Sequence, residues 1–508
     1  MENRNNCLTF AFKIRTMAKD SDGSYGHVLK YTGVFGGVQG LNILLGLVRN
    51  KIVALLLGPS GMGLVSLFST TVDFVSKSTN FGVPFSGVRR LSALCDSGDA
   101  SALEREVMVV RVWCLLTAFL GMFVCVALGP FLSQTAFAWG DHSLHFMLLS
   151  PAVGMLAVTG GETAILKALR RLGALAYVQL FTAVAALFIS VPIYICFGEA
   201  GIVPVIVITT FVTMLFTLRR SLQVQPLRLS WEKSLIGEGT GMIVLGVAYT
   251  LAAIAGSGSE MVIRSYLNVQ GDLDVLGLYN AGYLLTVTYA GMVFSAMDTD
   301  FFPRLSAVQQ DVAATNLTVN RQMEVSLLLL SPMLVVMIIA LPVLIPLLFS
   351  ARFLPVVAMT QVAALAMYLK VLTLPVAYIT LARAKSLAFL LLEVAYYMVL
   401  VVLMVFCFER WGLLGTGIAL LLAHLFDYVL INGYAYIKYG YRCSVTVFRY
   451  AFVQLSLGAF AYVLTLSASG IAYWLLGIVV VLLSGLFSLQ VLRRKTHLWE
   501  ALTRRFRR

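Results

Sequence analysis

Charged residues are scarce in this sequence. They make up 12% of its 508 residues, whereas hydrophobic residues make up 59%. Soluble domains carry about 25% charged residues, which keep their surfaces in water. Apolar stretches recur from Val28 almost to Val491, and the mean hydropathy is +0.89. No segment is therefore large enough for a separate soluble domain, and the composition predicts one polytopic membrane unit.

Motifs for bond chemistry are missing as well. The seven cysteines form no CxxC pair, and Cys114 and Cys125 lie inside an apolar run, so neither a disulfide framework nor a zinc site is indicated. We find no nucleotide-binding P-loop and no nucleophile motif. No cofactor and no metal are expected. Any transport must then draw on a H+ or Na+ gradient, on the membrane potential or on removal of the transported molecule.

The positive charge of the chain has a topological explanation. The formal net charge is +13, but the Lys and Arg residues form short clusters between apolar runs instead of a basic domain. A nucleic-acid-binding surface would need the basic residues on one continuous face. We therefore expect no nucleic-acid partner.

The apolar runs are long enough to cross a membrane many times. A spanning helix needs about 20 mainly apolar residues, because backbone groups cannot stay unpaired in hydrocarbon. Fourteen runs qualify, which predicts an all-α polytopic protein. They cover approximately residues 30–48, 61–85, 106–129, 146–167, 174–196, 200–218, 239–263, 274–297, 324–349, 357–381, 386–407, 412–436, 448–467 and 471–491.

The loop charges alternate in the way that the positive-inside rule requires. Loops after the even-numbered spans are rich in Lys and Arg, as at Arg89 and Arg90, and the opposite loops hold few cations. Both termini are therefore expected in the cytoplasm. Four cations break the rule near the outer ends of spans, namely Arg49, Lys51, Arg264 and Arg352.

Two segments form a weak internal repeat. VRNKIVALLLGPSGMGLVSLF at 48–68 parallels IRSYLNVQGDLDVLGLYNAGY at 263–283, and each has an Arg, a glycine-containing turn and a Gly-Leu that opens the next helix. Repeats of this kind in transporters frame a substrate site near the bilayer middle. Chance similarity between two apolar helix-turn-helix segments is the alternative.

Four stretches together resemble a known family. They are GLVRNKIVALLLGPSGMGLVSLF (46–68), LKALRRLGALAYVQ (166–179), the segment from LGLYNAGYLLTV through FFPRLS (276–306) and LLFSARFLPVVAMTQVAAL (347–365). Their order and spacing resemble the oligosaccharide flippases of the O-antigen translocase type. These belong to the superfamily of multidrug, oligosaccharidyl-lipid and polysaccharide exporters.

The resemblance implies a fold of two six-helix bundles in a V around a central cavity, with two more helices at the C-terminus. On this basis the chain divides into a cytoplasmic lead-in at 1–29, a first lobe at 30–218, a cytoplasmic linker at 219–238, a second lobe at 239–436, two additional transmembrane helices at 437–491 and a basic cytoplasmic tail at 492–508.

The resemblance also implies a function. Such a flippase moves an undecaprenyl-pyrophosphate-linked oligosaccharide repeat unit from the cytoplasmic to the outer leaflet of the bacterial inner membrane by alternating access. The sugar would serve O-antigen in lipopolysaccharide, capsule or a related surface polysaccharide. The expected partners are this lipid-linked oligosaccharide, membrane lipids, and polysaccharide polymerase and chain-length proteins, and a monomer is sufficient.

Cations inside the spans are the candidate substrate-binding residues, because a charge at the bilayer centre costs about 2.5 to 3.5 kcal/mol on insertion scales. Lys370 lies near the middle of its span and either lines the cavity or pairs with an acid. Arg49, Lys51 and Arg264 either bind phosphate or are interfacial anchors whose stems extend to the headgroups. Lys77 is the fifth candidate. The resemblance implies cations in the cavity, with Arg49 at a matching place in the first helix.

Four further residues are candidates for coupling or gating: Asp73, Glu260, His424 and Asp427. Asp73 lies one helical turn before Lys77, so the two can also neutralise each other. His424 and Asp427 are three residues apart and either relay protons or form a helix-packing pair. Four other acids lie near cytoplasmic helix ends, where they can be solvated or can pair with cations, namely Glu162, Asp298, Asp300 and Glu393.

Two other functions fit the same composition. A cation-coupled multidrug exporter of the same superfamily would share the fold, but its cavity should be acidic, whereas Arg and Lys predominate among the candidates here. A membrane polysaccharide polymerase or ligase usually needs a sizeable outer loop, and the longest one here is at about 130–145. We therefore predict a transporter and not an enzyme.

Overall fold

The structure is a computed structural model. The expected lead-in up to residue 22 and the basic tail beyond residue 495 lie outside the residues that it describes, and so do Asp298 and Asp300. The described residues are 23–97, 99–136, 140–226, 233–288, 291, 294, 301–302, 304–383 and 385–495.

Every regular element in the described residues is a helix. This confirms the predicted all-helical fold class. The shorter elements are α3 (Val83–Ser97), α5 (Gly129–Ala136), α10 (Leu273–Tyr283), the 3-10 helices η1 (Gly198–Gly201) and η3 (Ala351–Val356), and the π-helical segment η2 (Leu284–Thr288). The longer helices are α2 (Gly23–Thr79), α4 (Ala100–Ala127), α6 (Ser143–Ala168), α7 (Leu172–Phe197), α8 (Ile202–Val224), α9 (Lys233–Gln270), α12 (Val312–Leu348), α13 (Val357–Ala382), α14 (Ser386–Tyr439), α15 (Val445–Ser467) and α16 (Gly470–Lys495).

The long helices match the predicted spans. In the described part of the chain, nine helical segments are long and apolar enough to cross a membrane. Three of them, Gly40–Thr79, Gly173–Val224 and Ser386–Tyr439, each cover two predicted spans. The helices α9 and α10 lie where the seventh and eighth spans are predicted. The chain is therefore a multi-pass membrane protein.

Two glycines separate consecutive spans inside elements that run on without a gap. Gly58 in α2 has φ 67°, and Gly412 in α14 has φ 56°. Both values lie in the left-handed region, which glycine enters without the steric cost of a Cβ. Pro59 follows Gly58 and suits the first turn of the next span, where no backbone N–H is needed. The G-P turn expected from the sequence is thus present.

Polar caps fix where several helices begin. Asp99 accepts hydrogen bonds from the first turn of α4, and Asp272 accepts one from the Val275 N–H at the start of α10. Asp311 and Ser444 do the same for α12 and α15. Each cap satisfies backbone donors that have no partner inside the helix.

The chain folds into two compact units. Unit 1 comprises Met1–Arg49, Thr71–Gln134 and Gly140–Thr250, and unit 2 comprises Asn50–Thr70, Thr135–Trp139 and Leu251–Arg508. The turn at Gly58 belongs to unit 2, together with the second half of α9. The two six-helix lobes and their boundaries, as expected from the sequence, stay a prediction.

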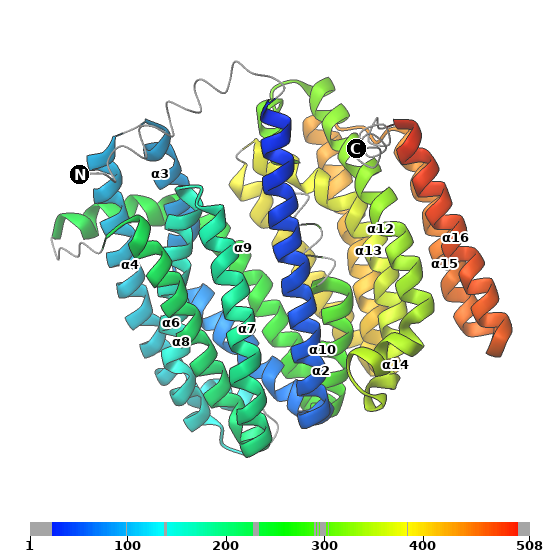
Figure 1. Ribbon diagram of the computed structural model, residues 1–508, viewed down its shortest axis with the longest axis horizontal. Helices are drawn as coiled ribbons and strands as arrows, with labels where there is room; N and C mark the ends of the chain where they lie inside the picture. The colour runs from blue at the N-terminus through cyan, green and yellow to red at the C-terminus, as the bar shows by residue number, and fades with distance from the viewer. Residues whose placement is uncertain are drawn as a thin grey trace. The chain divides into compact units, whose positions relative to one another are not determined.

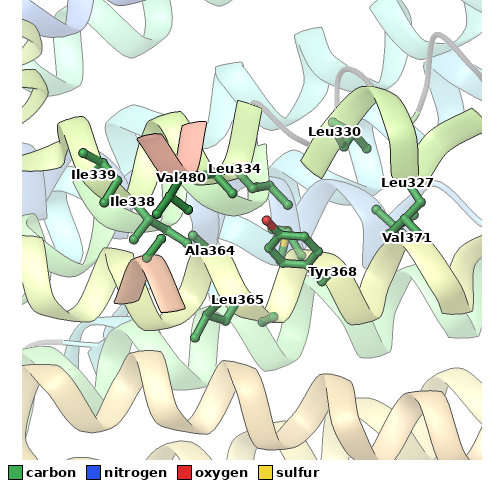
Figure 2. Packing of buried hydrophobic residues seen from close by; sticks show 14 of the residues in the cluster. Leu327, Leu330, Leu334, Ile338, Ile339, Ala364, Leu365, Tyr368, Val371 and Val480 are labelled. Atoms are coloured by element: carbon green, nitrogen blue, oxygen red, sulfur yellow. The ribbon is translucent and has the colours of Figure 1, made fainter. Parts of the chain in front are cut away.

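Each unit has an apolar core of its own. In unit 1 the side chains of α3, α4 and α6 meet around Val109, Val110 and Ile165, all fully buried. In unit 2 the helices α12 and α13 pack together, and α15 and α16 lie beside α12 (Figure 1). Figure 2 shows the centre of this core, where Tyr368 lies among aliphatic side chains and Val480 of α16 joins them. The two C-terminal helices are therefore an integral part of unit 2.

Candidate functional site

The two repeat segments pack against each other within unit 2. Gly63 lies so close to the backbone of Leu273 that a Cβ at residue 63 would overlap the Leu273 carbonyl group, and Gly277 lies equally close to the backbone of Pro59. When the two segments are aligned on their Gly-Leu pairs, Gly63 and Pro59 correspond to Gly277 and Leu273, so the two contacts are reciprocal. Reciprocal contacts are those that a two-fold axis generates. The repeat is therefore a structural one.

Polar side chains also join the two repeat segments, next to the close backbone contacts. The Ser66 hydroxyl donates to the Asn280 side-chain oxygen over 3.0 Å, and these two residues also correspond in the repeat. The Arg264 Nε donates to the same Ser66 hydroxyl oxygen over 2.8 Å. The repeat contact thus positions Arg264, whose side chain is almost completely buried.

Arg264 is neutralised inside unit 2. Its Nη1 lies 3.0 Å from a carboxylate oxygen of Glu260, one helical turn away. The Tyr283 hydroxyl donates to the other carboxylate oxygen of Glu260 over 3.0 Å. The guanidinium carbon also lies 5.1 Å from the centre of the Tyr283 ring. The pair of the candidate residues Arg264 and Glu260 is thus built into a network that spans α2, α9 and α10.

Lys370 lies among acids. Its ammonium group interacts electrostatically with the carboxylates of Glu393 and Asp427 and with His424. Its Nζ lies 6.0 Å from the centre of the Phe294 ring. The two roles that the sequence left open for Lys370, in the cavity or in a pair with an acid, stay a prediction.

His424 does not pair with Asp427. Its Nδ1 lies 2.9 Å from the Tyr396 hydroxyl, which joins the two halves of α14. The His424 side chain is buried, and its Nε2 has no hydrogen-bond partner within the described residues. Tyr397, the neighbour of Tyr396, donates a hydrogen bond to the Glu393 carboxylate. Tyrosine hydroxyls therefore hold two members of this cluster, which we call the Lys370 cluster: Lys370, Glu393, Tyr396, Tyr397, His424 and Asp427.

The two cations at the end of the first span have different surroundings. The Lys51 ammonium donates to the Pro346 carbonyl oxygen over 2.7 Å and so caps the end of α12 in unit 2. Arg49 belongs to unit 1, where its guanidinium interacts with the Tyr194 hydroxyl of α7. Among the described residues Arg49 makes no ion pair, and its buried Nε has no hydrogen-bond acceptor.

Asp73 and Lys77 form the ion pair that their spacing predicts. Their charged atoms lie 2.7 Å apart, and both side chains are about half exposed. An exposed pair of this kind contributes little to stability, because solvent screens it. Both charged groups therefore lie partly exposed on the surface of unit 1.

Unit 1 contains a buried ion pair of which the sequence singled out only Glu162, as an acid that can pair with a cation, and not its partner Arg111. The Arg111 guanidinium binds both carboxylate oxygens of Glu162, at 2.9 and 3.2 Å, and also donates to the carbonyl oxygens of Gln225 and Pro226. Arg111 lies in a predicted span, so it could have been found as an intramembrane charge. Together Arg111 and Glu162 hold the start of the predicted linker against α4 and α6.

The other end of this linker is held by arginines too. Arg90 of α3 pairs with Glu106 at 2.9 Å and donates to the Glu238 carbonyl oxygen. Arg105 binds the Glu238 carboxylate at 2.6 and 3.0 Å. Both partners of each contact belong to unit 1, so these contacts hold the linker to unit 1.

A metal centre has no support in this part of the chain. Among the described residues, no three His, Cys, Asp or Glu side chains are placed to hold a metal ion.

Comparisons with known proteins identify the family. Residues 52–358, more than half of the chain, match the model of the polysaccharide biosynthesis protein family. The chain belongs to this family. No curated protein matched the sequence.

Solved structures show which fold the chain shares. The inward closed form of the lipid II flippase MurJ superposes with a TM-score of 0.68 at 12% identity, covering 91% of this chain and 99% of that one. A multidrug resistance MATE transporter in its inward-facing form gives 0.65 at 12% identity, covering 84% and 99%. A MOP superfamily transporter from Pyrococcus furiosus gives 0.59 at 11% identity, covering 85% and 96%. The chain shares the fold of these transporters, as the sequence resemblance predicts.

Proposed function

We propose that the chain is a flippase that moves an undecaprenyl-pyrophosphate-linked oligosaccharide from the cytoplasmic to the outer leaflet of the bacterial inner membrane. Membership of a polysaccharide biosynthesis family supports an oligosaccharide as part of the transported molecule. The fold shared with MOP superfamily transporters supports transport by alternating access. Both termini would lie in the cytoplasm. Polymerase and chain-length proteins would use the sugar on the outer side.

The observation that carries this proposal is the presence of cations inside apolar spans of both units. Arg49 lies in the segment Gly40–Thr79, and Lys370 lies in the segment Ala351–Ala382. An intramembrane cation is costly and is kept where it has a task. A pyrophosphate group is a polyanion that must cross the same hydrophobic layer, so cations lower its transfer cost. An acidic cavity, as expected for a cation exporter, would not do so.

Arg49 is the residue that we assign to the phosphate. Arg264 is already neutralised by Glu260, and Lys51 is used by the Pro346 carbonyl. Arg49 makes no ion pair in the described part of the chain, so its guanidinium can offer two parallel N–H donors to phosphate oxygens. The exposed Lys77 is the second cation of unit 1 that we assign to this role.

The membrane potential can supply the driving force. An anion that moves outward leaves the negative side of the membrane, which is favourable by about 2.3 kcal/mol per charge per 100 mV. The transported anion then needs no nucleotide hydrolysis. Collapse of the potential with an ionophore should therefore slow the flipping step, even when the pH gradient is clamped.

The test is the amount of lipid-linked sugar left on the cytoplasmic leaflet in cells that carry Arg49→Ala. Loss of hydrogen bonds to a charged group costs about 1.5 to 3 kcal/mol, so transport should fall roughly ten- to hundredfold. Arg49→Lys keeps the charge but not the paired donors, so its transport rate should lie between those of the wild type and Arg49→Ala. Lys51→Ala is the matched control, since it removes a cation two residues away that serves α12.

The results of this test distinguish a flippase from a multidrug exporter, and a phosphate ligand from an interfacial anchor. Accumulation of the lipid-linked sugar and loss of surface polysaccharide in Arg49→Ala, at normal protein levels, support the flippase. Normal surface polysaccharide in a stable Arg49→Ala variant would make Arg49 an interfacial anchor. Export of cationic drugs by the wild type, with no effect on surface sugar, would favour the multidrug exporter.

A further inference from the structure

We infer that Arg220 and Tyr177 of unit 1 bind the phosphate group of an anionic phospholipid in the surrounding membrane. The inference goes beyond the proposed function, because it concerns a lipid that stays in the bilayer and not the molecule that is transported. The residues that carry it all belong to α7 and α8 of unit 1, which η1 joins. The test therefore needs no transport assay.

Two neighbouring helices supply the residues of this site. Tyr177 and Phe181 lie one turn apart on α7. Phe216 and Arg220 have the same spacing on α8. The two helices pack against each other (Figure 1). The guanidinium carbon of Arg220 lies 3.6 Å from the centre of the Tyr177 ring. At this distance the ring covers one face of the guanidinium, which is a cation–π contact.

The Tyr177 ring is itself held by two other rings. Its centre lies 4.0 Å from that of Phe181 and 6.4 Å from that of Phe216, which it meets edge-on. The centres of the Phe181 and Phe216 rings are 6.0 Å apart. Aromatic rings that lie this close attract each other, so the three form a small cluster. The cluster fixes the Tyr177 ring, and the ring in turn orients the Arg220 guanidinium before any ligand binds.

Arg220 still has hydrogen-bond donors to offer. Its Nη1 donates to the side-chain oxygen of Gln223 over 3.1 Å. A guanidinium carries five N–H donors, and Arg220 makes no ion pair within the described residues. Two parallel N–H groups of an arginine match two oxygens of one phosphate group. A phosphate that binds the edge of this guanidinium therefore meets a cation whose orientation is already set.

Lipid covers much of the surface of these two helices. The segment Gly173–Val224 is apolar, yet only 11% of its apolar stretch is buried inside the protein. Phe181, Phe211 and Leu215 are among its exposed apolar side chains. Acyl chains are as apolar as such side chains and are their natural surroundings in a bilayer. A phospholipid bound at Arg220 therefore finds an apolar surface for its acyl chains, which a free phosphate ion would not use.

The site lies at the level of the lipid headgroups. Arg220 follows the predicted span 200–218, and Tyr177 lies near the start of the predicted span 174–196. Tyrosine is enriched at this depth, and exposed arginines such as Arg219 favour the cytoplasmic side. Anionic lipids of that leaflet attract basic residues near the membrane surface. Phosphatidylglycerol carries a single negative charge, which one guanidinium neutralises.

The experiment measures the melting temperature of the purified full-length protein in nanodiscs of phosphatidylcholine that contain increasing fractions of phosphatidylglycerol. The melting temperature of the wild type should rise by roughly 2 °C and then level off, because the bound lipid stabilises the folded state. Arg220→Gln removes the guanidinium and should raise the half-saturating fraction of phosphatidylglycerol about tenfold or more. Arg220→Lys keeps the charge without the paired donors, so its half-saturating fraction should lie between those of the wild type and Arg220→Gln.

Two more variants test the stacking of Arg220 and the effect of general charge. Tyr177→Leu keeps an apolar side chain but removes the ring, and it should raise the half-saturating fraction roughly threefold. Arg219→Gln is the matched control, since it removes the same charge from an exposed neighbouring residue that makes no cation–π contact within the described part of the chain. This variant should respond to phosphatidylglycerol like the wild type. Soluble glycerol phosphate, added to phosphatidylcholine nanodiscs, should not change the melting temperature.

Three results would overturn the inference. They are a wild type without a saturable rise, an Arg219→Gln protein that loses as much affinity as Arg220→Gln, and a glycerol phosphate that raises the melting temperature as phosphatidylglycerol does. The second result would show a general attraction of charges, and the third would show a site for free phosphate. The melting temperature in pure phosphatidylcholine shows whether each variant folds. If Arg220→Gln does not fold, an unchanged response of both Arg220→Lys and Tyr177→Leu would overturn the inference as well.

Discussion

The close contact of the two repeat segments predicts a large effect of one methyl group at Gly277. A Cβ at this residue would lie 2.5 Å from the carbonyl carbon of Pro59 and closer still to its oxygen, whereas ordinary contacts begin at 3.4 Å. The backbones must therefore move apart by roughly 1 to 1.5 Å, since no flexible side chain can yield. Gly277→Ala should lower the free energy of unfolding by about 3 kcal/mol, at the upper end of overpacking costs.

The assay is thermal denaturation of the purified protein, where 3 kcal/mol corresponds to a drop in Tm of about 3 °C for a chain of 508 residues. Gly433→Ala is the matched control, because a Cβ at residue 433 of α14 meets nothing within 4 Å. This variant should melt like the wild type or slightly higher, as alanine is the better helix former. If Gly277→Ala and Gly433→Ala have the same melting temperature, the two repeat segments do not pack as closely as described.

Two further predictions concern unit 1. Arg111→Ala leaves the buried Glu162 carboxylate without its cation and should cost about 3 to 5 kcal/mol of stability, whereas Arg111→Met with Glu162→Gln should recover most of it in the same denaturation assay. Hydrogen bonds from Ala102 and Ser101 hold the pKa of Asp99 below its usual 3.8, so its capping of α4 is present above that pH and is lost as the pH falls through the lowered pKa. The protection of the amides in the first turn of α4, measured relative to their intrinsic exchange rate at each pH, should therefore persist until the pH is below 3.8. A loss of protection already at pH 5 would contradict this.

Much of the fold could be predicted from the sequence because the bilayer imposes a simple rule. Each span must be apolar and helical over about 20 residues, so hydropathy alone locates helices such as α4 and α6. Turn residues are equally local, as the G-P pair at Gly58 shows. The grouping of Asn50–Thr70 with the second half of the chain was not predictable, because it depends on contacts between residues some 200 positions apart.

The candidate site was predictable in part. The cost of burying a charge singles out Arg49, Arg264 and Lys370 from their place in apolar runs. Their partners were harder to find, since Tyr283 and Tyr397 belong to a residue type that is common at membrane interfaces. The i, i+3 spacing of His424 and Asp427 suggested a pair, but the partner of His424 is Tyr396 across the turn of α14.

Composition and hydropathy act residue by residue along the chain, and they therefore predict a helical, polytopic protein with cations in its spans. Which of those cations have an acidic partner depends on the tertiary structure. Arg264 pairs with Glu260 at 3.0 Å, while Arg49 makes no ion pair within the described residues. Electrostatic neutralisation acts over a few ångströms in space, and the separation of residues along a chain does not specify that distance.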